Sequence, residues 1–216
     1  MGGLGILFLL FAYIWLNIKL INYVWKNLSK PAATVTTILI LAFPFVDAMI
    51  GRAELKAKCE VGTRIVVKRS IPNIEAIFVD GGITDDSPSY YGYKAVEDKG
   101  YNDKWHGQGV RRATESGDPK NAIIEKEAEK IAVYGLWTEG LPKTFWLNAE
   151  RYTINNRAKT DELGSFIWYS FRGGWAEYVV MTFSDAGPSR VAECGDTEAE
   201  LNKIKELLHT TLQPAK

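Results

Sequence analysis

The chain has 216 residues, of which 46% are hydrophobic, and its 26 basic residues are matched by 26 acidic ones. This balance excludes a bulk nucleic-acid binder, since such proteins need excess Lys and Arg to neutralise phosphates. With two histidines, two cysteines and no zinc-ligand motif, the sequence also predicts no metal site and no cofactor.

Two uninterrupted apolar runs fill the first fifty residues. The runs 3–25 and 32–50 carry one charged residue each, Lys19 and Asp47. Each run reaches the roughly 20 helical residues that cross about 30 Å of hydrocarbon. The sequence therefore predicts a transmembrane helical hairpin over residues 1–51, followed by a water-soluble domain over the rest of the chain.

Two other interpretations of these runs are less favoured. A cleaved signal peptide would need a basic n-region and a small-residue cleavage site, and the first run has neither. Core helices of a soluble protein carry their apolar residues on one stripe, whereas residues 8–15 and 35–46 are apolar all round.

The charged flanks predict which side of the membrane the domain occupies. Lys26 and Lys30 lie between the two runs and Lys19 can snorkel toward them, which places this loop in the cytoplasm. Residues 52–216 are then extracytoplasmic, which for a bacterial inner membrane means periplasmic. Basic residues after the second run favour the opposite orientation; they are Arg52, Lys56, Lys58, Arg64, Lys68 and Arg69.

Four polar residues lie within the predicted spans: Asn17, Lys19, Asn22 and Asp47. Lys19 and Asp47 fall at different depths in an antiparallel hairpin, so we expect each to reach an interface rather than the other. Asn17 and Asn22 are candidates for hydrogen bonds to a partner helix.

The two cysteines, Cys59 and Cys194, stand near the two ends of the predicted domain. An extracytoplasmic location favours a disulfide between them, which would close a long loop. Two unrelated reduced thiols remain the alternative.

Residues 52–216 predict an α+β domain with a mainly antiparallel sheet. Residues 53–61 alternate like a strand but are good helix formers, and we favour a helix that extends the second span to about Glu60. Residues 121–137 fit either an exposed helix or an edge strand. The predicted strands are 64–71, 74–79, 151–154, 165–171, 175–183 and 190–194, with a hairpin turn at 172–174.

The last element is a helix. Thr197 and Glu200 match a capping box at its start. Its expected apolar stripe consists of Leu201, Ile204, Leu208 and Leu212.

No motif in the domain predicts catalysis. His209 is expected to be a surface residue near a helix end, and a pairing of Cys59 with His106 lacks a recognisable motif. Asp80, Asp85 and Asp86 offer oxygen ligands in one loop, but their spacing is not that of an EF-hand, which favours a solvated turn.

One stretch is dense in aromatic and basic residues. Such side chains dominate contact hot spots, so this stretch is a candidate interaction surface, with a sheet core and its rim as the alternative. Its members are Tyr90, Tyr91, Tyr93, Trp105, Arg111 and Arg112.

Several short segments carry a resemblance. Residues 43–47 lead to Gly51, Cys59-Glu60 leads into 64–68, and 151–154 and 191–193 follow later. These segments resemble the membrane-to-domain junction of uncharacterised small bacterial inner-membrane proteins with a soluble C-terminal domain. The resemblance implies a membrane location and no known activity.

The sequence thus predicts a non-catalytic, membrane-tethered interaction or scaffold module of a bacterial envelope complex. Its expected partners are the lipid bilayer and a membrane or periplasmic protein, not nucleic acid. An alternative is a small-ligand or ion-sensing domain that uses the loop 80–93, and a thiol-dependent enzyme comes third.

Overall fold

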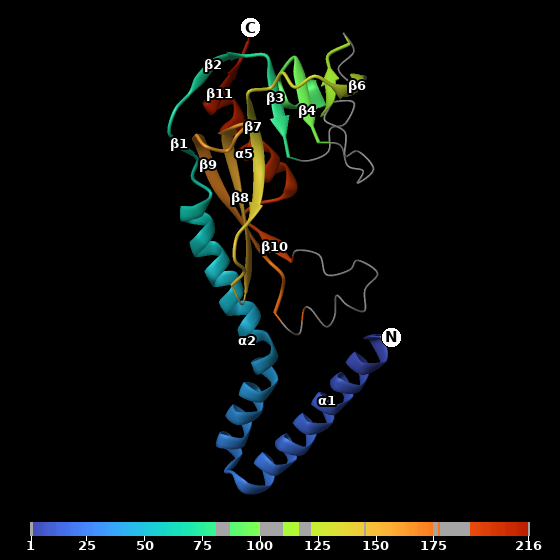
Figure 1. Ribbon diagram of the computed structural model, residues 1–216. Helices are drawn as coiled ribbons and strands as arrows, with labels where there is room; N and C mark the ends of the chain where they lie inside the picture. Colours follow the sequence, from blue (N-terminus) through green and yellow to red (C-terminus); the bar gives the residue numbers. More distant parts are fainter. Residues whose placement is uncertain are drawn as a thin grey trace. The chain divides into compact units, whose positions relative to one another are not determined.

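The computed structural model describes residues 2–80, 87–99, 110–116, 122–144, 146–174, 177 and 191–215 (Figure 1). They form two compact units. The helical unit comprises Met1–Ala57, Lys143–Asn148 and Ser170–Glu193. The sheet unit comprises Lys58–Pro142, Ala149–Tyr169 and Cys194–Lys216. Two segments from later in the chain thus cluster with the N-terminal helices.

Two helices dominate the helical unit, α1 (Gly2–Asn27) and α2 (Lys30–Gly62). The prediction that a helix continues past the second apolar run is confirmed, since α2 extends to Gly62. It bends by 58° between Lys30–Phe43 and Phe45–Gly62. The break falls at a proline, which has no backbone N–H for the helical ladder.

The described helices meet the requirements for a membrane span only in part. No single helix among them is both long and apolar enough to cross a bilayer. The two segments of α2 on either side of the bend meet the length and composition criteria together.

The distal half of α2 has a buried face that packs against the end of β9. Ala48, Gly51 and Leu55 recur every three or four positions and are buried, which places them on one side of the helix. A Cβ at Gly51 would collide with the ring of Phe171. Glycine is therefore required here because the helix backbone lies directly against that ring.

The strands form one large sheet and a small one. The large sheet has the order β1-β9-β8-β7-β3-β4-β5-β6, and β10 pairs with β9. Their bounds are β1 Val66–Val67, β3 Ala76–Val79, β4 Ala95–Asp98, β5 Val110–Thr114, β6 Ile123–Ala128, β7 Tyr134–Gly140, β8 Leu147–Asn156, β9 Glu162–Phe171 and β10 Ala192–Glu193. The small sheet pairs β2 (Ile71–Ile74) in parallel with β11 (Leu212–Pro214).

The expected α+β class with a mostly antiparallel sheet and a C-terminal helix is confirmed. One part of the sheet departs from it, since β3 runs parallel to both of its neighbours, β4 and β7. Residues 121–137 contain the edge strand β6 and the start of β7, which decides against a helix there.

Other strand predictions are met in part. Residues 151–154 and 165–171 lie within β8 and β9, whereas 64–71 is divided between β1 and β2. The predicted partner of β9, residues 175–183, lies outside the described residues except for residue 177, and the described partners of β9 are β8, β1 and β10.

Helix α5 (Thr197–Thr211) covers one face of the sheet. Its Ile204, Leu207 and Leu208 share a core cluster with strand residues that include Ile77 and Val96. A short helix, α3 (Ser87–Tyr91), precedes β4.

Two details of the last helix differ from expectation. The N-cap is Asp196, whose carboxylate accepts a 2.7 Å bond from the N–H of Ala199, so the helix begins one residue earlier than the capping box implied. Leu207 rather than Leu201 lies in the buried stripe, and Leu212 is buried in β11 beyond the helix end.

An unusual connection joins β6 to β7. In the sheet order these strands are separated by β5, β4 and β3, yet only residues 129–133 link them along the chain. Four strand spacings require about 19 Å, and fully extended chain between Ala128 and Tyr134 supplies about 20 Å. This segment, called the strap below, must therefore cross the sheet face without slack.

Candidate functional site

The strap crosses the outer face of the sheet, which is the face opposite α5. Strand residues alternate between faces, so the neighbours of the core residues Ile77 and Val96 point outward. Three small outward residues, Ala76, Ala95 and Thr114, are aligned in register across β3, β4 and β5.

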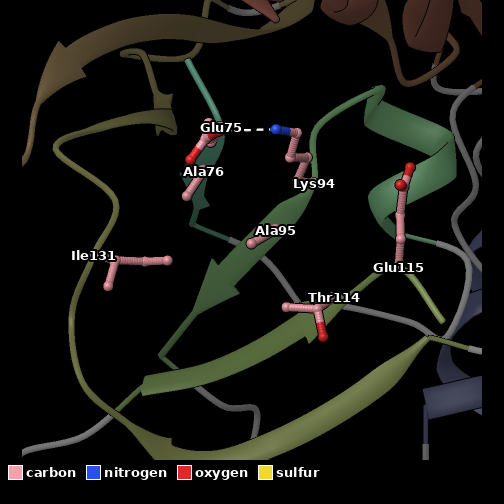
Figure 2. A pocket seen from close by; sticks show the side chains of 7 residues that line it. All are labelled: Glu75, Ala76, Lys94, Ala95, Thr114, Glu115 and Ile131. Atoms are coloured by element: carbon pink, nitrogen blue, oxygen red, sulfur yellow. Dashed lines mark hydrogen bonds and ion pairs between the residues drawn. The ribbon is translucent and has the colours of Figure 1, made fainter. Parts of the chain in front are cut away.

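This row of small side chains leaves a pocket of about 380 Å³ (Figure 2). Ala76, Ala95 and Thr114 form its floor, and Ile131 points toward it from the strap. Ile131 is 51% exposed although it is a large aliphatic residue. Next to Thr114 in register stands Ile123 of β6, which is also exposed.

Charged side chains stand at the rim of the pocket. Lys94 Nζ lies 2.8 Å from Glu75 Oε1, and Glu115 lines the same pocket. The hydrogen bond and the charge of Lys94 lower the pKa of the Glu75 carboxyl, which is therefore ionised at neutral pH. Both partners of this pair are well exposed, so it contributes little to stability.

One wall of the pocket, the strap, is held by a buried carboxylate. Glu97 of β4 is fully buried, and its oxygens accept bonds from the N–H groups of Ile131 at 3.0 Å and Ala132 at 3.3 Å. The same carboxylate accepts from Arg112 at 3.1 and 3.2 Å and from Arg157 at 2.8 Å. A single side chain thus fixes the strap to the middle of the sheet.

The two arginines also contact the strap directly. Arg112 donates to the carbonyl of Glu129, and Arg157 donates to the carbonyl of Ala132 at 3.0 Å. Burial alone would raise the pKa of Glu97, but the bonds from the two strap N–H groups and the two arginines lower it below its ordinary value. Glu97 is therefore a stable anion that clamps the strap.

A second buried carboxylate occupies the next position of β4. Asp98 is fully buried and receives a bidentate contact from Arg111, with distances of 3.0 and 2.5 Å. The hydrogen bond to Asp98 raises the pKa of Arg111. Both acid–base pairs follow the β4–β5 register, in which Glu97 stands opposite Arg112 and Asp98 opposite Arg111.

The aromatic and basic residues that were candidates for an interaction surface do not form one exposed patch among the described residues. Arg111 and Arg112 are engaged with Asp98 and Glu97. Tyr93 is buried, which corrects its placement on a surface: its ring fills the core and its hydroxyl donates to the carbonyl of Leu212 at 2.5 Å. Burial also raises the pKa of Tyr93.

The other members of that set are not exposed anchors either. Tyr90 and Tyr91 are half-buried and contact each other edge to face, with ring centroids 4.8 Å apart. Lys205 of α5 lies over the Tyr90 ring at 3.8 Å. Trp105 lies outside the described residues.

Candidate ligating and catalytic residues are likewise dispersed. His209 Nε2 lies 2.8 Å from the Tyr91 carbonyl, and Asp80 pairs with Lys99 at 3.1 Å. His106, Asp85 and Asp86 lie outside the described residues. Within the described ranges, no group of three His, Cys, Asp or Glu residues is arranged to hold a metal ion.

The two cysteines meet as expected. Cys59 in the last turns of α2 and Cys194 just before α5 have Sγ atoms 1.97 Å apart and Cα atoms 5.1 Å apart, which is disulfide geometry. The pair closes a loop with a sequence separation of 135. A bonded Cys59 is not available as the nucleophile of a thiol enzyme.

Three of the four polar residues in the apolar helices have a partner within their own helix. Asn17 donates to the Tyr13 carbonyl one turn earlier at 2.8 Å, and Lys19 lies over the Trp15 ring at 5.5 Å. Asp47 accepts from the N–H of Ala48 at 2.8 Å, and Asn22 is exposed.

The pocket and the Glu97 clamp were not predicted from the sequence. A local signal for the clamp exists, because the acidic pair Glu97-Asp98 follows Ala95-Val96 and the basic pair Arg111-Arg112 follows Val110. Antiparallel pairing of two such segments places the acids opposite the bases.

The geometry defines an α+β domain with a clamped crossover strap and a shallow pocket of mainly apolar floor, joined to two apolar helices. No family model, curated protein or solved structure matches the chain significantly.

Proposed function

We propose that this protein is a non-catalytic module of a bacterial envelope complex, tethered to the inner membrane by α1 and the proximal half of α2. The single observation that carries the proposal is the exposure of large apolar side chains along both helices. Phe11, Trp15, Leu39, Phe43 and Met49 are each more than 60% exposed. An apolar surface of this extent requires lipid or a partner to cover it.

The sheet unit supports the tether interpretation because, unlike the two helices, it buries many of its large apolar side chains in a core. Its apolar residues close a core between the sheet and α5, with Ile154, Leu163 and Leu207 fully buried. The two units therefore differ as expected for a lipid-exposed anchor and a water-exposed domain.

The interaction role is supported by the outer face of the sheet. A pocket with a floor of small side chains, flanked by the exposed Ile131, fits an apolar side chain presented by a partner protein. In the described part of the chain, this is also where two exposed isoleucines, Ile123 and Ile131, stand on one sheet face.

The compartment is inferred from charge and from cysteine usage. A disulfide between Cys59 and Cys194 persists in an oxidising compartment such as the periplasm. Lys26 in the last turn of α1 and Lys30 at the start of α2 favour a cytoplasmic loop and an extracytoplasmic domain.

Topology is tested with reporters fused after Lys216. We expect a phosphatase-type fusion to be active there, and the protein to remain with the membrane after an alkaline wash, because α1 and α2 both cross the bilayer. A fusion active only with a cytoplasmic reporter would contradict the orientation. Release by the alkaline wash would contradict the tether itself.

The partner surface is tested by Ile131→Asp, with Val133→Asp as the matched control. Both residues are exposed on the strap, but only Ile131 lines the pocket. We expect Ile131→Asp to weaken crosslinking to the partner by about tenfold or more, since a buried charge would enter the contact. Equal losses in both variants, or none in either, would show that the pocket is not the partner site.

A further inference from the structure

The helical unit also contains the open end of the β8–β9 hairpin. Strands β8 and β9 are joined by the tight turn 157–161, so the start of β8 and the end of β9 lie at the same end of this hairpin. The residues that flank this end, Lys143–Asn148 and Ser170–Glu193, belong to the helical unit. They cluster with α1 and with α2 up to Ala57.

The turn after β9 packs directly on α2. A Cβ added to Gly174 would lie 2.8 Å from the Cβ of Ala48 and 2.6 Å from a carboxylate oxygen of Asp47. Glu177 holds the turn in place, since it accepts from the Gly174 N–H at 3.0 Å and pairs with Arg52 of α2. The turn thus has a defined position along α2.

That position coincides with the end of the apolar run. At 1.5 Å per residue, the helical path from Lys30 to Ala48 is about 27 Å, less than the roughly 30 Å of a hydrocarbon core. The 58° bend of α2 shortens the direct distance further. If α2 enters the membrane at Lys30, a turn packed on Ala48 therefore lies no farther out than the opposite headgroup layer and not in bulk water.

The exposed side chains around this point suit a headgroup layer. Arg172 and Lys143 are exposed and cationic, and the half-buried Trp146 directly precedes β8. Lys and Arg attract lipid phosphates, and tryptophan prefers the interface because its ring is apolar and its N–H is polar. The carboxylate of Glu177 is already engaged within the turn and does not oppose these charges.

We propose that the end of the β8–β9 hairpin is a second membrane contact, in which Arg172, in the turn beside residues 47–52 of α2, and Lys143, in the same compact unit, bind lipid headgroup phosphates. This contact rests on the tether proposed above. It adds that the helical unit contacts lipid through the turn after β9 as well as through its helices.

The test places one fluorescent label at a time on the oxidised full chain in vesicles of mixed zwitterionic and anionic lipid. The native cysteines are bonded, so Arg172→Cys, Lys143→Cys, Lys203→Cys and Trp15→Cys each provide one labelling site. Lys203 in α5 is the control for bulk water, and Trp15 in α1 reports the tether. Lipids carry a quencher either at the headgroup or deep in the acyl chain.

We expect the headgroup quencher to reduce fluorescence at positions 172 and 143 at least about twofold more than at position 203, and more strongly with anionic lipid. The acyl-chain quencher should act on position 15. Quenching at 15 with 172 and 143 no different from 203 would overturn the second contact and leave the tether standing. No quenching at 15 would overturn the tether and the contact together.

Discussion

Replacement of Glu97 by alanine is expected to cost about 3–5 kcal/mol of unfolding free energy, because it leaves buried cationic groups and two strap N–H groups without their acceptor. Four residues donate five hydrogen bonds to this one carboxylate: the strap residues Ile131 and Ala132, and Arg112 and Arg157. The measurement is denaturant unfolding of the full chain in detergent micelles, followed by tryptophan fluorescence.

A matched control comes from the same network. Glu125 also pairs with Arg112, at 3.1 Å, but its side chain is 58% exposed. Glu125→Ala is therefore expected to cost less than about 1 kcal/mol. Similar losses for Glu97→Ala and Glu125→Ala would show that the clamp does not hold the strap.

The pH dependence of the stability that Glu97 contributes follows from the lowered pKa of its carboxyl. A carboxyl whose pKa is lower in the folded state binds fewer protons there than in the unfolded state, so its contribution is fully present above the unfolded pKa of about 4.3. It is lost as the pH falls through the folded pKa. The difference in stability between wild type and Glu97→Gln should therefore shrink below about pH 4.5 and stay constant above it. A difference that grows on acidification would contradict this assignment.

Loss of the Cys59–Cys194 disulfide is expected to cost roughly 2–5 kcal/mol, since the bond closes a long loop and restricts the unfolded chain. Cys59→Ser, Cys194→Ser and the double variant should unfold at the same denaturant concentration. Each of them should match wild type treated with a reductant.

The same proteins provide the check on oxidation state. Wild type purified without reductant should contain no titratable thiol, and each single variant should contain one. Two thiols in unreduced wild type would refute the bond, and a reductant effect on the double variant would show that stability changes for another reason.

The helices were predictable because their signals are local. The uniform apolarity of 3–25 and 32–50 predicts long helices whatever they contact. The pair Thr197 and Glu200, with the spacing of Ile204 and Leu208, predicts α5. The extension of α2 to Gly62 followed from helix propensity and the lack of a breaker.

The candidate site was not predictable because it depends on strand order. The pocket exists only because β3, β4 and β5 are neighbours, which aligns Ala76, Ala95 and Thr114. The strap reaches Glu97 only because β7 pairs with β3 and not with β6. The sequence of residues 90–93 shows that they are rich in tyrosine, but it does not show which of these side chains packs against the rest of the protein. Tyr93 is therefore predicted on a surface, whereas it lies in the core.

The pairing of β11 with β2 has a consequence for how the domain is made. Residues 212–214 supply a neighbour for 71–74, and the carbonyl of Leu212 accepts the buried Tyr93 hydroxyl, so early segments depend on a late one. Contacts this distant in sequence form slowly, since a long loop must close first. The pairing of β2 and the acceptor of the Tyr93 hydroxyl can therefore form only after residue 214 has been synthesised. Until then, the chain around Ile71–Ile74 and Tyr93 lacks native contacts that complete the core.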